Sequence, residues 1–207
     1  MKRRAAAAAT AAMLLLSAAC ASKFPQAPQS FTIDPPAVRA VPPAGATRVL
    51  SLRRAETSAA YAGVELVYRV AEHGIERDPY ASFAAPPSWL VTSAMRGYLR
   101  NADFVRDVVV PGEGIPVDAE IEPDVLELAG DFASASEPAA VLTIHFRVVA
   151  PGVGAAPATE ILLKAYTRRR PLSRRTAAAV VEAWNVELGE IMADFIADLD
   201  RALPPRR

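Results

Sequence analysis

Cysteine is almost absent from this chain, because Cys20 is the only one among its 207 residues. A single thiol excludes an intramolecular disulfide, so the fold must rest on its hydrophobic core. Histidine is nearly as scarce: His73 and His145 are the only two, and neither stands in a ligand spacing such as His-x-x-x-His. We therefore expect neither a metal ion nor a cofactor.

An excess of charge of one sign is also missing. The chain has 23 basic and 23 acidic side chains, which gives no basic field for nucleic acid. We therefore expect no nucleic acid among its partners. Beyond the first 20 residues, no apolar run approaches the roughly 18 residues of a membrane-spanning helix.

Catalytic motifs are missing as well, because the chain has no G-x-S-x-G elbow, P-loop or G-x-G-x-x-G fingerprint. Asp118, Glu120 and Glu122 alternate along an expected strand, so the solvent face of a sheet explains them better than paired acids of a glycosidase do. We expect a protein that is not an enzyme.

A hydrolase stays open as a minor alternative. It would need Ser134 or Ser136 as the nucleophile and His145 as its base.

The first 20 residues are typical of a secretion signal. Three basic residues, at 2–4, precede an apolar stretch at 5–16 that is too short to span a membrane. Small residues then lead into Cys20, and the run "LSAAC" at 16–20 resembles the bacterial lipobox. An ordinary signal peptide with a stray cysteine is the alternative.

The lipobox resemblance implies that residues 1–19 are a lipoprotein signal peptide and that Cys20 is lipidated with fatty acyl chains such as palmitate. Residues 20–29 would then be a lipidated tether, and two or more acyl chains hold a protein on a membrane permanently. Ala21 stands where an Asp would signal retention in the inner membrane. This difference implies sorting to the outer membrane of a Gram-negative bacterium.

Hydrophobic periodicity predicts a mixed sheet and two helices. Alternating residues predict strands, with a bulge or an edge at Pro123. Apolar residues at helical spacing predict a mid-chain helix capped by Ser88 and a long C-terminal helix capped by Ser173. The pattern indicates a single α/β or α+β domain. The strands are expected at 30–34, 48–53, 63–70, 104–110, 117–128, 140–149 and 159–167, and the helices at 88–101 and 174–203.

Two segments are candidate partner-binding sites. Arg168, Arg169 and Arg170 belong to the only basic cluster, which suits anionic lipid headgroups or an acidic partner. A solvated strand-to-helix connection is the simpler and favoured explanation of the cluster. Tyr80 and Phe83, in the segment "YASFAAPP", are the second candidate.

Several segments in this order resemble the ABC-type transport auxiliary lipoproteins, a family of PqiC-like outer-membrane lipoproteins. The segments are "SFTID", "RVLSLRR", "VELVYRV" with Tyr68 and Arg69, "YASFAAPP" and the Ala-rich closing helix. The chain departs from the family pattern in the aromatic segment, where Phe83 and Ala85 replace a common tryptophan and a common acid.

The resemblance implies a three-layer α/β fold with a mixed sheet of about six strands, one mid-chain helix and a long C-terminal helix, in a periplasmic auxiliary-lipoprotein domain at 30–207. It also implies a lipid-anchored protein on the periplasmic face of the outer membrane. There it would be the non-catalytic docking subunit of an ABC/MCE-type lipid transport system that supports membrane integrity. Its partners would be an MCE-type protein and the ABC transporter components.

The residues leave three questions open. A periplasmic carrier or sensor that binds lipid under the long helix is the alternative function. Homo-oligomerisation and the transported cargo are not decided by the residues.

Overall fold

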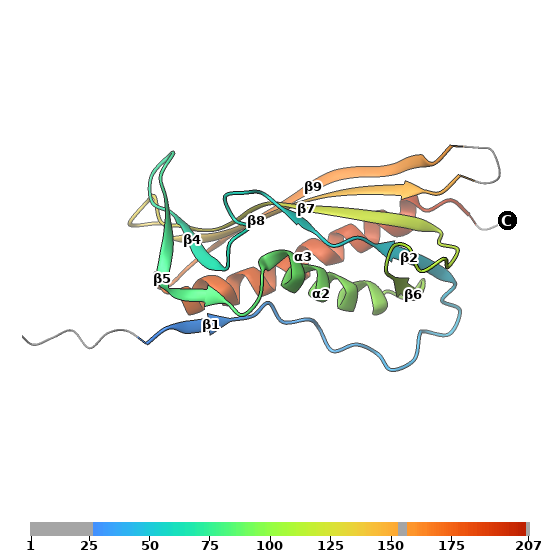
Figure 1. The fold of residues 1–207 in the computed structure, drawn as a ribbon, viewed down its shortest axis with the longest axis horizontal. Helices are drawn as coiled ribbons and strands as arrows, with labels where there is room; N and C mark the ends of the chain where they lie inside the picture. The colour runs from blue at the N-terminus through green and yellow to red at the C-terminus, as the bar shows by residue number, and fades with distance from the viewer. Residues whose placement is uncertain (1–26, 153–156, 206–207) are drawn as a thin grey trace, which may run out of the picture.

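The structure is a computed structural model that describes residues 27–152 and 157–205. The predicted signal peptide and Cys20 lie outside the described residues. Within them the chain forms a single α/β domain with two helices and a mixed sheet of nine strands, more than the six expected (Figure 1). The elements are β1 (Gln29–Phe31), β2 (Arg48–Leu52), β3 (Glu56–Thr57), β4 (Glu65–Arg69), β5 (Ile75–Phe83), α2 (Pro87–Arg100), β6 (Val105–Val109), β7 (Ala119–Asp131), β8 (Ala139–Ala150), β9 (Thr159–Pro171) and α3 (Ala177–Ala202).

Strand β7 organises the sheet. Along one edge it pairs in parallel with β2, β3 and β4 in turn, while its other edge pairs antiparallel with β8, which in turn pairs with β9. Strand β6 extends the sheet beyond β2 in parallel, and β5 and β1 extend it beyond β4. The predicted mixed sheet is therefore confirmed.

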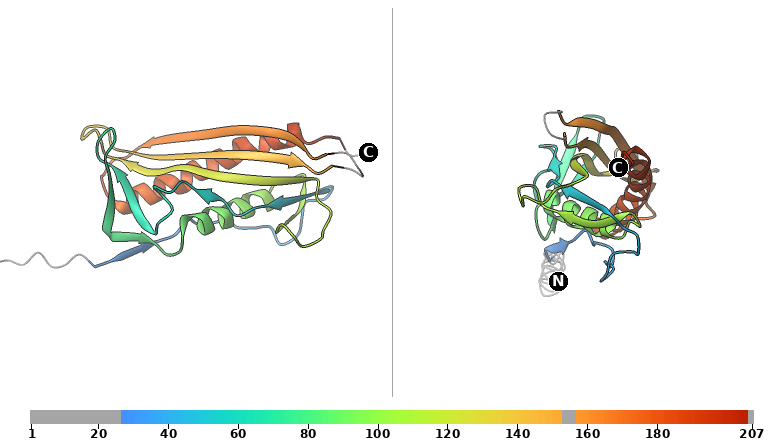
Figure 2. Two further views of the ribbon diagram at one scale, coloured as in Figure 1. Left: turned by 45° about the horizontal axis from the view of Figure 1, so that its top comes forward. Right: turned by 90° about the vertical axis from the view of Figure 1, so that its right-hand side faces the viewer.

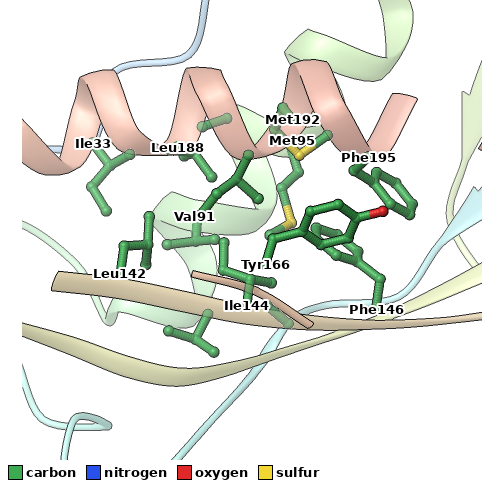
Figure 3. Packing of buried hydrophobic residues seen from close by; sticks show 14 of the residues in the cluster. Ile33, Val91, Met95, Leu142, Ile144, Phe146, Tyr166, Leu188, Met192 and Phe195 are labelled. Atoms are coloured by element: carbon green, nitrogen blue, oxygen red, sulfur yellow. The ribbon is translucent and has the colours of Figure 1, made fainter. Parts of the chain in front are cut away.

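Both helices pack on the same side of the sheet, and Figure 2 shows the long strands β7, β8 and β9 curving over them. Helix α3 presents its apolar stripe to this face because its apolar residues recur at helical spacing. Among them are Trp184 and Phe195, which are fully buried. Phe195 stacks on Phe146 of β8 with ring centroids 3.9 Å apart (Figure 3). The indole Nε1 of Trp184 donates to the Val141 carbonyl at 3.2 Å, so the buried polar atom is satisfied.

The third layer that the family resemblance implied is not a regular layer of helices or strands. The far side of the helices is covered by the extended chain that follows β1 (Figure 1). Its Asp34 N–H donates to the Asn185 side chain of α3 at 2.8 Å, and its Ala37 carbonyl accepts from Asn101 at the end of α2. The opposite face of the sheet is largely polar: Arg147 pairs there with Glu122 and Glu160, although its ladder partner Leu163 is also exposed. A polar face of this kind faces water and needs no covering layer.

The ends of both helices differ from the prediction by one to three residues. Helix α2 begins at Pro87 with Pro86 as its N-cap, not Ser88, because proline suits the first helical turn, where the backbone N–H has no partner. Helix α3 is capped by Thr176, whose hydroxyl accepts from the Ala179 N–H, and not by Ser173.

Strand β5 was not predicted, because Pro79 is unfavourable within a central strand. The ladder with β4 tolerates this proline through an irregularity: Val67 pairs with Arg77, and the next pair on that side is Glu65 with Ser82. The bulge is held by the carboxylate of Asp78, which accepts from the backbone N–H groups of Tyr80 and Ala81.

Pro123 lies in a regular pair with Phe146, and the irregularity of β7 falls between Val125 and Glu127 instead. On its other edge Pro123 falls between the residues that pair with β2 and those that pair with β3. The missing N–H therefore breaks no ladder hydrogen bond there.

No helix within residues 27–152 and 157–205 combines the length and apolarity needed to cross a membrane.

Candidate functional site

A half-open hollow of about 390 Å³ lies where the parallel strands β2 and β6 end, beside the first turns of α2. We call it the Trp89 groove. Ligands of α/β sheets bind preferentially at the carboxyl ends of parallel strands. The lining residues are Leu52, Arg54, Trp89, Thr92, Ser93, Arg96 and Val110.

Helix α2 has one face in the core and another at the groove. Val91, Met95 and Leu99 are fully buried, whereas Trp89 and Ser93 are exposed and one turn apart on another face. Trp89 is 58% exposed, and Val110, directly after β6, is 46% exposed. An exposed tryptophan beside an exposed valine is apolar surface that the fold itself does not use.

The groove is positively charged. The Arg54 guanidinium lies 5.0 Å from the centroid of the Trp89 ring, in a cation–π contact. Arg96 donates to the Val108 carbonyl at 3.2 Å, and neither arginine forms an ion pair with another described residue. No acidic side chain lines this hollow, so it suits an anionic group next to an apolar one.

The hollow continues into a wider, open channel of about 930 Å³. Arg54, Trp89 and Val110 line both spaces, so they form one continuous surface. The channel is more polar, and Glu56 is its only acidic residue. Its remaining lining comes from Arg53, Ala55, Thr57, Ala62, Ser88, Pro111 and Gly112.

The three predicted arginines do not form a free basic patch. Arg168 pairs with Asp194 and Glu190 of α3, and Arg170 pairs with Glu190. Arg169 points to the other side of the strand and reaches Asp131 at 3.0 Å. The cluster ties β9 to α3 and β7, and its charges are largely compensated within the domain.

Tyr80 and Phe83 have different environments. Tyr80 is 45% exposed, so it is available to a partner. Phe83 is 5% exposed and stacks on Trp184, with ring centroids 5.7 Å apart. Phe83 is therefore a core residue, because β5 turns its side chain toward the helices.

The hydrolase candidates are not brought together. Ser134 and Ser136 contact each other at 3.1 Å in the β7–β8 connection. His145 lies six residues after Ala139, the first residue of β8, which is on the order of 20 Å along an extended strand. Its imidazole faces Asp124 at 3.6 Å. No group of three or more potential metal ligands occurs among the described residues.

A buried acid lies near the arginine cluster and was not predicted. Glu187 of α3 is fully buried beside a small cavity of about 140 Å³ lined by Arg168, Arg169 and Arg170. Burial raises the pKa of its carboxyl to about 8, while Arg170 and Arg168 partly oppose this. Neither carboxylate oxygen accepts a hydrogen bond of normal geometry from a described residue.

Comparisons with known proteins support the fold. No family model matches the chain, and no curated protein matches it. Among solved structures, a Xanthomonas campestris protein of family DUF330 is similar over 80% of this chain and 93% of its own, with a TM-score of 0.65 and 19% identity.

Two further solved structures are similar. An uncharacterised protein has a TM-score of 0.64 and 10% identity, over 84% of this chain and 99% of its own. The hypothetical protein CT253 of Chlamydia trachomatis has a TM-score of 0.50 and 8% identity, over 76% of this chain and 98% of its own. At these identities the likeness shows that the chain shares the fold of these proteins.

Proposed function

We propose that this chain is an outer-membrane lipoprotein, anchored through Cys20, that acts in the periplasm as a non-catalytic docking subunit of an ABC/MCE-type lipid transport system. The transport system comes from the family resemblance of the sequence. The observation that carries the docking role is that strand β1 begins at Gln29, at the end of the tether.

The residues directly after the tether are part of the folded domain. Strand β1 begins at Gln29 and pairs with β5, and the following residues are bonded to both helices through Asn185 and Asn101. Gln29 lies nine positions after Cys20, which gives a reach of at most about 30 Å. A lipid on Cys20 would therefore hold a rigid domain close to the membrane surface, where confinement raises its effective concentration for a partner.

The interior favours docking over lipid carriage. A carrier would need a cavity under the long helix, but the layer between α3 and the sheet is filled by side chains (Figure 3). Trp184, Leu188 and Phe195 are each 0–1% exposed there. An acyl chain would have to displace this close-packed core.

The experiment compares the full-length protein with Cys20→Ala in a Gram-negative host. Labelling with a palmitate analogue, fractionation of the two membranes and co-purification are measured for both. We expect the label, outer-membrane residence and recovery of MCE or permease components with the wild type only. An unlabelled wild type in the soluble fraction would remove the anchor. A labelled protein that recovers no transport component would remove the docking role.

A further inference from the structure

We propose that the Trp89 groove is the docking site for an extended, acidic segment of a partner polypeptide that carries an aromatic or large aliphatic side chain. This inference rests on the proposed docking role and deepens it, because it names the surface of the domain and the chemistry of the partner. Three features of the groove carry it.

The first feature is uncompensated charge. The arginines of the outer sheet face and of β9 are paired: Arg147 with Glu122 and Glu160, and Arg168 with Asp194 and Glu190. By contrast, Arg54 and Arg96 form no ion pair with a described carboxylate, and both line the same hollow. Glu56, Glu122 and Asp124 share a separate, smaller hollow with Arg54. Two guanidinium groups around one hollow without an acid complement an anionic ligand, and guanidinium forks match carboxylates.

The second feature is an apolar contact surface next to that charge. The ring of Trp89 is held by Arg54, and Leu52 and Val110 complete the apolar part of the lining. Tryptophan and arginine are the side chains most enriched among energetically dominant interface residues. A partner's aromatic or aliphatic side chain can therefore cover Trp89 while its carboxylates reach Arg54 and Arg96.

The third feature is shape, which favours a peptide over a lipid. Only three apolar side chains line the hollow, so most methylene groups of a long acyl chain would stay in water and lose the roughly 0.8 kcal/mol that each gains on burial. The open channel past Thr57 and Gly112 continues from the hollow, and its walls present polar and apolar groups in similar measure. An extended peptide, whose backbone needs polar partners, fits such a channel.

The test selects a random peptide library against the full-length protein held in nanodiscs of neutral lipid. The affinity of a selected, labelled peptide is then measured by fluorescence anisotropy. The groove variants are Arg54→Glu, Arg96→Glu and Trp89→Ala. The matched control is Arg106→Glu, because Arg106 is also an exposed arginine without an ion pair among the described residues but lies outside the groove. Thermal unfolding verifies that every variant folds.

We expect the selected peptides to be rich in Asp and Glu around an aromatic or aliphatic residue. Each groove variant should weaken binding about tenfold or more, which corresponds to about 1.4 kcal/mol, and Arg106→Glu should change it less than about twofold. Higher ionic strength should also weaken binding. Selected peptides that are not acidic, or whose binding ignores Arg54 and Trp89, would overturn the proposal.

Two other outcomes would also overturn it. One is a failure to enrich any peptide. The other is binding of free palmitate, or of nanodiscs with anionic lipid, that depends on Arg54 and is tighter than binding of any peptide; the groove would then be a lipid site.

Co-purification from cells distinguishes a failure of the groove proposal from a failure of the proposed function. If the double variant of Arg54 and Arg96 still recovers the transport components, the docking role stands and the groove is not its site. If the wild type recovers none and yet binds acidic peptides, the groove stands and the transport assignment falls.

Discussion

Arg69 on β4 donates through Nη2 to Asp131 at the end of β7 over 2.8 Å, and Arg169 on β9 donates to the same carboxylate oxygen over 3.0 Å. Asp131 also accepts from the Ala133 backbone N–H, and its side chain is 9% exposed. One nearly buried carboxylate therefore joins three strands that are far apart in the sequence.

Replacing Asp131 with Ala should destabilise the domain by about 1–3 kcal/mol. The range is below that of a fully buried pair, because both arginines are partly exposed and regain water. The measurement is urea unfolding at pH 7, with Asp124→Ala as the control, since Asp124 faces His145 on the more exposed outer face. Equal losses in the two variants would show that the cluster contributes nothing beyond a surface ion pair.

The Asp131 cluster should also produce a pH dependence. The hydrogen bond from Arg69 is the main reason why the pKa of Asp131 lies below its usual value. A lowered pKa in the folded state gives stability that is present above the unfolded-state pKa, about 3.9, and is lost as the pH falls below it. The difference in stability between wild type and Asp131→Asn should therefore shrink on acidification below about pH 4. A difference that stays constant would argue against the ion pair as its cause.

Glu187→Gln should remove a pH dependence of the opposite sign. The pKa of Glu187 is raised to about 8 by burial, so the folded protein retains a proton that the unfolded chain releases above about pH 4.3. Its contribution to stability is present at low pH and is lost as the pH rises toward 8. Between pH 5 and 9 the wild type should lose on the order of 4 kcal/mol relative to the variant, in urea unfolding.

The control for Glu187 is Glu182→Gln, a change on the exposed side of the same helix. Its stability should follow that of the wild type across the whole pH range. If the stability of Glu187→Gln also follows that of the wild type across this pH range, the buried carboxylate is ionised and compensated in the folded protein.

Phe83→Ala and Tyr80→Ala should separate a core residue from a surface residue in the same segment. Phe83 stacks on Trp184 and is buried, so its truncation should cost about 3–5 kcal/mol. Tyr80→Ala should change stability by less than about 0.5 kcal/mol. Guanidinium unfolding followed by circular dichroism measures both. A large loss for Tyr80 would mean that its exposed ring stabilises β5.

Gly130→Ala should destabilise the domain through overpacking, by about 1–3 kcal/mol. A methyl group there would lie 2.7 Å from the ring of Tyr68 and 3.2 Å from Val180. Gly63→Ala is the matched control, because its close neighbour is the end of the flexible Glu65 side chain. The measurement is the thermal unfolding midpoint of each variant. Equal midpoints would show that the Tyr68 ring moves aside without a loss of stability.

The Trp89 groove shows why a candidate docking surface was harder to predict than the core. The apolar stripe of α2 is visible as Val91 and Met95 at helical spacing, and Trp89 stands off that stripe. This was a usable signal, since a large aromatic residue off the core stripe is exposed. Its neighbours Arg54 and Val110 come from distant parts of the chain, and only the pairing of β2 with β6 places them beside α2.

By itself, the sequence determined those helices and strands whose hydrophobic periodicity is visible within one short segment. The long helix, the strands β2, β4, β8 and β9, and the single mixed domain follow from which residues alternate and which recur every three to four positions. The lipobox resemblance of the first 20 residues is likewise a property of adjacent residues.

Only the tertiary structure decided which side chains share an environment. It placed Pro123 between two partner strands, held β5 together through Asp78, buried Glu187 and paired the arginines of β9 with acids of α3. Burial and charge compensation depend on neighbours from other segments, and these free energies have no counterpart in local sequence. The same reason explains why the basic cluster, prominent in the sequence, is neutralised in the fold, while Arg54 and Arg96, 42 residues apart in the sequence, remain available in one groove.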